Sequence, residues 1–154
     1  MKRTYTMRFA HLKNPSGLRV DSTIKQGDAI GVMGSSGAST AAHLHLDVVE
    51  GIVTKNWRLS DYESGVKTAT PKQLARCLNK RLFGVYPVVT TAYDDRDYYV
   101  GFGKLHSAFD LVPEDRHETQ GHYLIRWPLL EHGVVTFAGY DNGYGNSVLI
   151  SYEA

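Results

Sequence analysis

Two histidines separated by a single residue form the pattern in this sequence that most directly suggests chemistry. The chain holds seven histidines, and His43 and His45 enclose Leu44 in a run of residues typical of a β-strand. Side chains at positions i and i+2 of a strand project from the same face, so the two imidazoles would stand side by side. A functional site is one interpretation, and two surface histidines on one strand are an equally good one for this pattern alone.

A histidine and a carboxylate, His106 and Asp110, form a second candidate pair with a spacing of four residues. This spacing keeps both side chains on one face of an extended segment, and both are ligand types that zinc accepts. A chain with seven histidines contains such a pair by chance fairly often. The third candidate, His11, ends an alternating segment, where a lone histidine is more often structural or solvated.

Residues 117–122, His-Glu-Thr-Gln-Gly-His, are similar to the zinc-protease helix motif H-E-x-x-H but are one residue too long. At about 100° per residue, a spacing of five leaves two helical histidines about 140° apart, so they cannot share a metal. We therefore expect His117, His122 and His132 to be loop residues. The sequence contains neither a G-x-S-x-G nucleophile motif nor a phosphate-binding G-x-x-x-x-G-K-[ST] loop.

Short alternating or β-branched runs predict that these candidate residues lie on strands. Residues 3–11 alternate as in a half-buried strand, one face of which would carry Tyr5, Met7, Phe9 and His11. The other expected strands cover residues 29–33, 43–49, 87–93, 109–112, 133–138 and 147–152. The stretches 51–70 and 113–128 are expected to be longer connections.

One helix is expected over residues 71–83. Thr70 is a candidate N-cap, Pro71 suits the first helical position, and Gln73 would complete a capping box. An apolar face follows at helical spacing, formed by Leu74, Cys77, Leu78 and Leu82. Gly84 is expected to end the helix.

The composition excludes several classes of protein. A length of 154 residues suits one domain, with 42% hydrophobic and 21% charged residues. A net charge of +1 argues against a dedicated nucleic-acid binder. No apolar run approaches the roughly 18 residues of a membrane span, and the single cysteine excludes an internal disulfide. The basic N-terminal residues precede no apolar stretch, so we expect no secretory signal.

Residues 27–49 strongly resemble the lysostaphin-type zinc endopeptidases, in which a glycine-rich stretch leads into H-L-H and a strand. Other segments resemble further parts of that family: residues 9–12 its aromatic-Ala-His-Leu segment, residues 106–111 its H-x-G-x-D motif, and residues 133–150 the two strands after that motif. Ala108 replaces the usual glycine, Ala41 and Ala42 replace Gly-Pro, and Leu46 replaces a frequent phenylalanine. None of these changes removes a group that binds metal or moves a proton.

The order of the motifs is reversed, because in the family H-x-G-x-D comes first and H-x-H last. The chain therefore resembles a circular permutant opened at one hairpin, which predicts that residues 3–11 pair with residues 146–152 and that the chain ends lie close together. We expect a mainly β fold, a single antiparallel β-sheet domain with one helix. Its predicted divisions within residues 1–154 are the H-x-H half (1–50), a connection with the helix (51–86) and the H-x-x-x-D half (87–154).

The resemblance implies one zinc ion per chain, held by His45, His106 and Asp110, with a position left open for water. It also implies that His11 and His43 line the site without binding the metal. One of them would act as a general base on the water, and the pair would steady the oxyanion or protonate the leaving amine.

Tyr98 or Tyr99 would be a candidate phenolic donor, although packing is the simpler role for each. The implied substrate is the peptide part of bacterial peptidoglycan, either stem peptide or cross-bridge. The alternative is a catalytically inactive peptidoglycan-binding or structural module of a phage particle, but all five histidine and aspartate positions are present, which favours the enzyme. A phage lysin or tail-associated enzyme, with other phage structural or lysis proteins as partners, is the setting that we expect.

Overall fold

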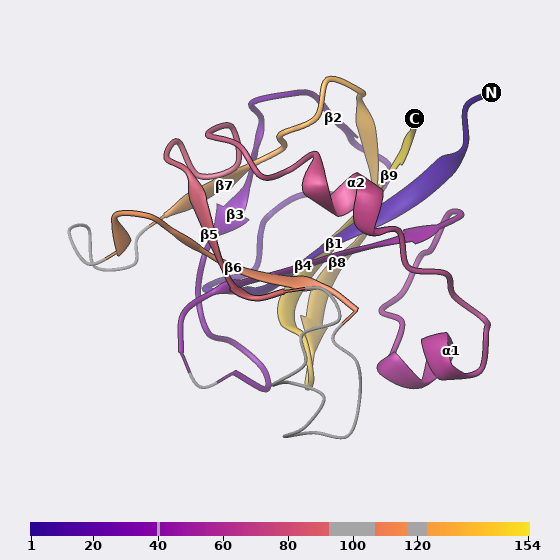
Figure 1. Ribbon diagram of the computed structural model, residues 1–154, viewed down its shortest axis with the longest axis horizontal. Helices are drawn as coiled ribbons and strands as arrows, with labels where there is room; N and C mark the ends of the chain where they lie inside the picture. Colours follow the sequence, from indigo (N-terminus) through magenta and orange to yellow (C-terminus); the bar gives the residue numbers. More distant parts are fainter. Residues whose placement is uncertain (40, 93–106, 117–122) are drawn as a thin grey trace.

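Antiparallel strands dominate the computed structural model, which describes residues 1–39, 41–92, 107–116 and 123–154 (Figure 1). The main sheet has seven strands in the order β2-β8-β9-β1-β4-β6-β5. In that order the strands span Thr23–Ile24, Gly133–Asp141, Gly145–Glu153, Thr4–Leu12, Leu44–Glu50, Phe109–Pro113 and Pro87–Thr91. A second sheet pairs β3 (Ala29–Val32) with β7 (Leu124–Arg126). The mainly β prediction is confirmed, whereas β7 lies in a stretch expected to be a connection.

The expected pairing between the first and last strands is confirmed. β1 lies between β9 and β4 in the sheet and is antiparallel to both. Beyond the last pair of that ladder, Arg3 and Ala154 exchange two backbone hydrogen bonds of 2.8 and 2.9 Å. The two chain ends accordingly lie side by side in Figure 1. This proximity agrees with the permutation hypothesis, which rests on the order of the motifs.

The two faces of the main sheet differ in chemistry. Alternation along β1 and β4 directs Met7 and Leu46 into the large apolar core, and places Arg8 and Asp47 on the opposite face. The prediction that β1 is half-buried is wrong, because residues 51–62 cover part of that opposite face. Arg8 is only 1% exposed.

The expected helix is shorter than predicted, since α2 spans Pro71–Ala75. The chain then continues in tight turns, as in the hydrogen bond from the Cys77 N–H to the Leu74 carbonyl at 3.0 Å. No capping box forms at this helix: the Thr70 hydroxyl donates instead to the Val48 carbonyl at 3.1 Å.

The apolar face of this segment also differs from the prediction at one position. Leu74, Cys77 and Leu82 are fully buried, but Leu78 is 37% exposed. Tight turns do not keep the rotation of about 100° per residue on which the prediction depended. The helix therefore contributes less to the core than its sequence pattern suggests.

A short helix, α1 (Leu59–Glu63), interrupts the stretch 51–70 that was expected to be a connection. Trp57, just before it, packs with Val49 and Leu149 in a second, smaller apolar cluster. Among the described residues, no helix is long and apolar enough to span a membrane.

Candidate functional site

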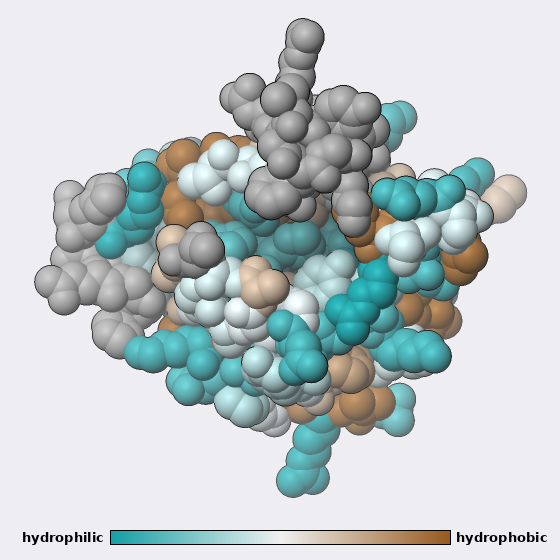
Figure 2. All heavy atoms as spheres, turned by 90° about the horizontal axis from the view of Figure 1, so that it is seen from below, coloured by the Kyte–Doolittle hydropathy of each residue, from teal (hydrophilic) through white to brown (hydrophobic). Residues whose placement is uncertain are grey.

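A pocket with a volume of about 260 Å³ lies on the polar face of the main sheet. Seen from that side, the molecule is hollowed and hydrophilic residues line the hollow (Figure 2). The polar side chains around the pocket come from β1, β4, α1 with the residue before it, and the β8–β9 turn, and include Arg8, His11, His45, Asp47, Arg58, Tyr62 and Tyr144. Two of the five residues predicted to form the site, His11 and His45, are therefore in its wall.

His45 of β4 and Asp110 of β6 are directly opposite each other in the antiparallel register. The His45 Nδ1 and Asp110 Oδ1 atoms are 3.4 Å apart, and both side chains are largely buried. Two ligand atoms bound at about 2.0–2.1 Å to one tetrahedral zinc lie roughly 3.3–3.4 Å apart. The donor types and their separation thus fit two positions of a zinc site.

His43 lies beside the same oxygen of Asp110. Its Nε2 is 3.6 Å from the Asp110 Oδ1. Its Nδ1 donates to the Ala41 carbonyl at 2.9 Å, and this hydrogen bond fixes the orientation of the ring. The structure therefore places both histidines of the H-L-H segment beside Asp110.

His11 faces the site because the backbone of β1 departs from regular strand geometry. The ladder between β1 and β9 shifts between Phe9 and Leu12, and His11 has a left-handed φ of 63°. Its ring centroid consequently lies 4.9 Å from that of His43 and 5.9 Å from that of His45. The prediction that His11 shares a face with Phe9 is wrong for this reason.

The glycine-rich loop before β4 holds the His11 ring in place. The His11 Nδ1 donates to the Ser36 carbonyl at 2.7 Å, which leaves Nε2 for proton transfer. Burial lowers the pKa of His11 to about 4, so the ring is neutral near pH 7. Ser36 is itself tied to the β8–β9 hairpin, since its hydroxyl accepts from the Asn146 N–H at 2.9 Å.

Asp47 and Arg8 are site residues that the sequence analysis missed. They are paired across β4 and β1 and form a two-contact ion pair with distances of 2.9 and 2.6 Å. The Arg8 guanidinium lies between the rings of Trp57 and Tyr144, 4.0 and 3.6 Å from their centroids. Burial opposes charge on Asp47, but Arg8 and then His45 outweigh it and hold the pKa of the carboxyl far below its usual range. Alternation along the strand was the available signal, because Asp47 follows His45 by two residues.

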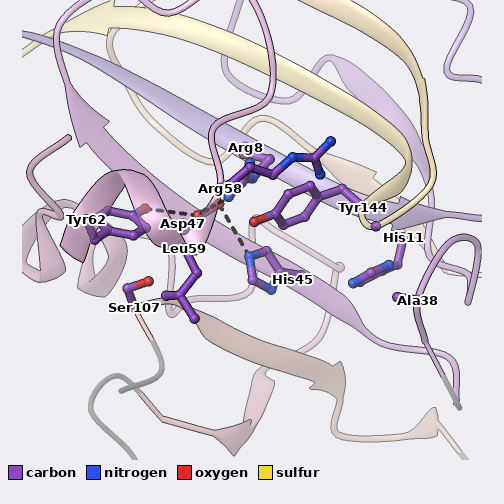
Figure 3. A pocket seen from close by; sticks show the side chains of 11 residues that line it. Arg8, His11, Ala38, His45, Asp47, Arg58, Leu59, Tyr62, Ser107 and Tyr144 are labelled. Atoms are coloured by element: carbon purple, nitrogen blue, oxygen red, sulfur yellow. Dashed lines mark hydrogen bonds and ion pairs between the residues drawn. The ribbon is translucent and has the colours of Figure 1, made fainter. Parts of the chain in front are cut away.

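Asp47 also contacts the predicted ligand His45. Its Oδ1 is 3.5 Å from the His45 Nε2, and Figure 3 shows His45 extending into the pocket with Asp47 behind it. Burial disfavours a charged His45 ring, but the carboxylates of Asp47 and Asp110 outweigh this effect and raise its pKa to about 9. Each of the three histidines thus has one ring nitrogen that faces a protein acceptor. The acceptors are the Ser36 carbonyl for His11, the Ala41 carbonyl for His43 and the Asp47 carboxylate for His45.

Several predicted residues lie outside the part of the chain that the structure describes: the expected ligand His106, the candidate donors Tyr98 and Tyr99, and His117 and His122. Within the described part, no three His, Cys, Asp or Glu side chains form a group arranged to hold a metal ion. His132 is exposed at the end of the sheet near Lys2 and Glu131, away from the pocket.

The structure is thus a β-rich protein in which three histidine rings lie close together and two of them, His43 and His45, lie beside Asp110. Residues 1–58 match the family model of Peptidase family M23, which agrees with the resemblance seen in the sequence. The matched segment contains His11, His43 and His45 but ends before Asp110. Neither the curated proteins nor the solved structures contain a significant match. This match supports a metallopeptidase as the general class.

Proposed function

We propose that this chain is a zinc-dependent endopeptidase that hydrolyses peptide bonds of bacterial peptidoglycan, in the stem peptide or the cross-bridge. The observation that carries the proposal is the separation of 3.4 Å between the His45 Nδ1 and the Asp110 Oδ1, with the rings of His11 and His43 adjacent. The substrate class comes from the resemblance to lysostaphin-type peptidases.

His45, Asp110 and His106 would hold one zinc ion per chain. The first two fit by donor type and separation, and His106 is the third ligand that the resemblance implies. When bound, the ion would polarise the scissile carbonyl and lower the pKa of a bound water towards about 7. Three protein ligands leave a position for water or substrate, as catalytic zinc sites require.

His11 and His43 would move the protons. The Nδ1 of each ring is committed to a backbone carbonyl, at Ser36 and Ala41 respectively, so Nε2 is the nitrogen that exchanges a proton. One Nε2 would accept the proton of the attacking water, and the other would protonate the leaving amine or steady the oxyanion. The two rings are adjacent, as transfer across one scissile bond requires.

The wall of the pocket beyond these histidines suits a peptide backbone. Tyr144 places a phenol group in the wall of the pocket, and Arg58, also in the wall, is partly exposed. Hydroxyl and guanidinium donors match the carbonyl oxygens of a peptide. The proposed setting is a phage lysin or a tail-associated enzyme, and neighbouring genes for phage structural or lysis proteins would support it.

Purified muropeptides that differ in cross-bridge chemistry test this function. The protein reconstituted with zinc should release new amino termini from at least one of them, and a chelator should abolish the release. The matched control is His45→Ala, which should be inactive with or without zinc. Failure of the parent protein to bind zinc would instead favour the alternative, a catalytically inactive peptidoglycan-binding or structural module.

A further inference from the structure

Asp47 occupies a buried polar site behind His45. The carboxylate is 1% exposed and accepts hydrogen bonds from two groups besides Arg8. The Trp57 Nε1 donates to its Oδ2 at 3.1 Å, and the Tyr62 hydroxyl donates to the same oxygen at 3.2 Å. These donors fix the position of Asp47 without involving His45.

Strand geometry directs this fixed carboxylate at His45. The two residues are separated by one position on β4 and therefore share a face of the sheet. The Asp47 Oδ1 is 3.5 Å from the His45 Nε2, while the His45 Nδ1 is 3.4 Å from the Asp110 Oδ1. The two ring nitrogens thus have different neighbours: Asp47 on the inner side and Asp110 on the side of the proposed metal.

We propose that Asp47 is the positioning residue for His45: it accepts the Nε2–H and thereby presents the Nδ1 lone pair towards Asp110. This inference rests on the proposed function, because it assigns the nitrogen through which His45 would bind zinc. Histidines that bind metals almost always donate their other ring N–H to a carboxylate, carbonyl or water, which fixes the tautomer and the ring orientation. Arg8 keeps Asp47 ionised and in place for this task.

The connection that covers the site takes part in this arrangement. Trp57 and Tyr62 both come from residues 51–62, and the Trp57 carbonyl also accepts from Arg8 at 2.6 Å. Trp57 therefore binds both members of the Arg8–Asp47 pair. Residues 51–62 therefore help to hold Arg8 and Asp47 in place, and Asp47 in turn contacts the His45 ring.

The tautomer of His45 in the parent protein is the first test. In zinc-loaded, ¹⁵N-labelled protein, long-range ¹H–¹⁵N spectra should show His45 protonated at Nε2 and coordinated through Nδ1. Coordination through Nε2 with the proton on Nδ1 would overturn the assignment of Asp47 while leaving the zinc site intact. If no zinc binds, the proposed function and this inference both fail.

Cobalt binding to Asp47→Asn is the second test. The amide changes the acceptor that faces His45, so the folded variant should bind Co²⁺ about 10–100-fold more weakly and show an altered visible absorption spectrum. Glu63→Gln, which removes an exposed carboxylate from α1, is the matched control and should leave both unchanged. A folded Asp47→Asn with parent affinity and spectrum would reduce Asp47 to a structural partner of Arg8. If the variant fails to fold, the tautomer in the parent protein decides the question.

Discussion

His45 and Asp110 face each other across β4 and β6, although they come from opposite halves of the sequence. The register of one antiparallel strand pair therefore assembles the two donors. A slip of one residue would turn either side chain to the other face of the sheet. The site accordingly depends on strand pairing as much as on the residues themselves.

The first prediction separates the histidines by role. His45→Ala and His106→Ala should lose zinc and hydrolysis together, because each removes a proposed ligand. His11→Ala and His43→Ala should keep zinc but lose turnover by about 10²–10⁴-fold, the usual contribution of a general acid or base. Zinc content measured beside muropeptide hydrolysis distinguishes the two groups.

Alanine variants of the remaining histidines are the controls for this prediction. His117→Ala, His122→Ala and His132→Ala should change neither zinc content nor turnover. If His43→Ala loses zinc while His45→Ala keeps it, the roles within the H-L-H segment are reversed. Loss of zinc in both His117→Ala and His122→Ala would indicate that the metal binds at residues 117–122, contrary to our interpretation of that segment.

The second prediction concerns the close contact between the glycine-rich loop and the β8–β9 hairpin. Gly145 has a φ of 67°, and a Cβ at this position would collide with the backbone of Ser36, whose carbonyl holds His11. Gly145→Ala should therefore reduce both stability and turnover. The expected loss of stability is about 1–2 kcal/mol for the left-handed conformation plus about 1–3 kcal/mol for the collision.

Gly65→Ala is the matched control, because Gly65 has a φ of 78° but no atom within 4 Å of an added Cβ. It should show only the conformational loss, with parent turnover. Urea unfolding and hydrolysis rates of both variants provide the comparison. Equal losses of stability at the two positions would show that Ser36 does not constrain residue 145.

The third prediction uses the ion pair between Arg58 and Asp141, which links the start of α1 to the β8–β9 turn at 2.8 and 2.6 Å. The Arg58 guanidinium lowers the pKa of Asp141 to about 2 from an ordinary value of 3.8. A lowered pKa in the folded state means that the pair stabilises the fold above about pH 4, and that this contribution disappears as the pH falls towards about 2.

Asp141→Asn isolates this charge, since an amide oxygen can still accept from the Gly143 and Tyr144 N–H groups that the carboxylate binds. Near pH 7 the variant should be less stable by about 0.5–1 kcal/mol, because the pair is partly exposed. The difference should shrink in urea unfolding curves recorded at decreasing pH, as long as the protein stays folded. A difference that does not depend on pH would contradict the ion-pair explanation.

The strands were predictable from sequence because alternation and β-branching act locally. Residues 133–138 and 147–152, for example, lie within β8 and β9. The face of the sheet on which His11 lies was not predictable, because it depends on a bulge in the pairing with β9 and on a left-handed φ. Asp47 was missed because its importance comes from Arg8 across the sheet, a relation that only register reveals.

The fourth prediction tests the one helix that the sequence placed correctly but made too long. Leu82 is fully buried whereas Leu78 is 37% exposed. Leu82→Ala should therefore destabilise the protein by about 2–5 kcal/mol, and Leu78→Ala by less than about 1 kcal/mol. Chemical unfolding of both variants measures the difference. Equal losses of stability would favour the longer amphipathic helix that the sequence predicted.

The last prediction tests whether the fold depends on the order of the segments along the chain. The permutation hypothesis requires that it does not. Arg3 and Ala154 are hydrogen-bonded to each other, so a short glycine-serine linker should join residue 154 to residue 1 without strain. New ends opened between Gly65 and Val66, both exposed, leave β4 and the Trp57 cover intact. This rearranged chain, which places residues 87–154 before residues 1–50, should give the parent circular dichroism spectrum, cooperative unfolding and zinc content. The same joined chain opened between Asp47 and Val48, inside β4, is the control and should not fold. If the chain opened at Gly65 also fails to fold, the present order is essential to this protein, and circular permutation does not explain the reversed motifs.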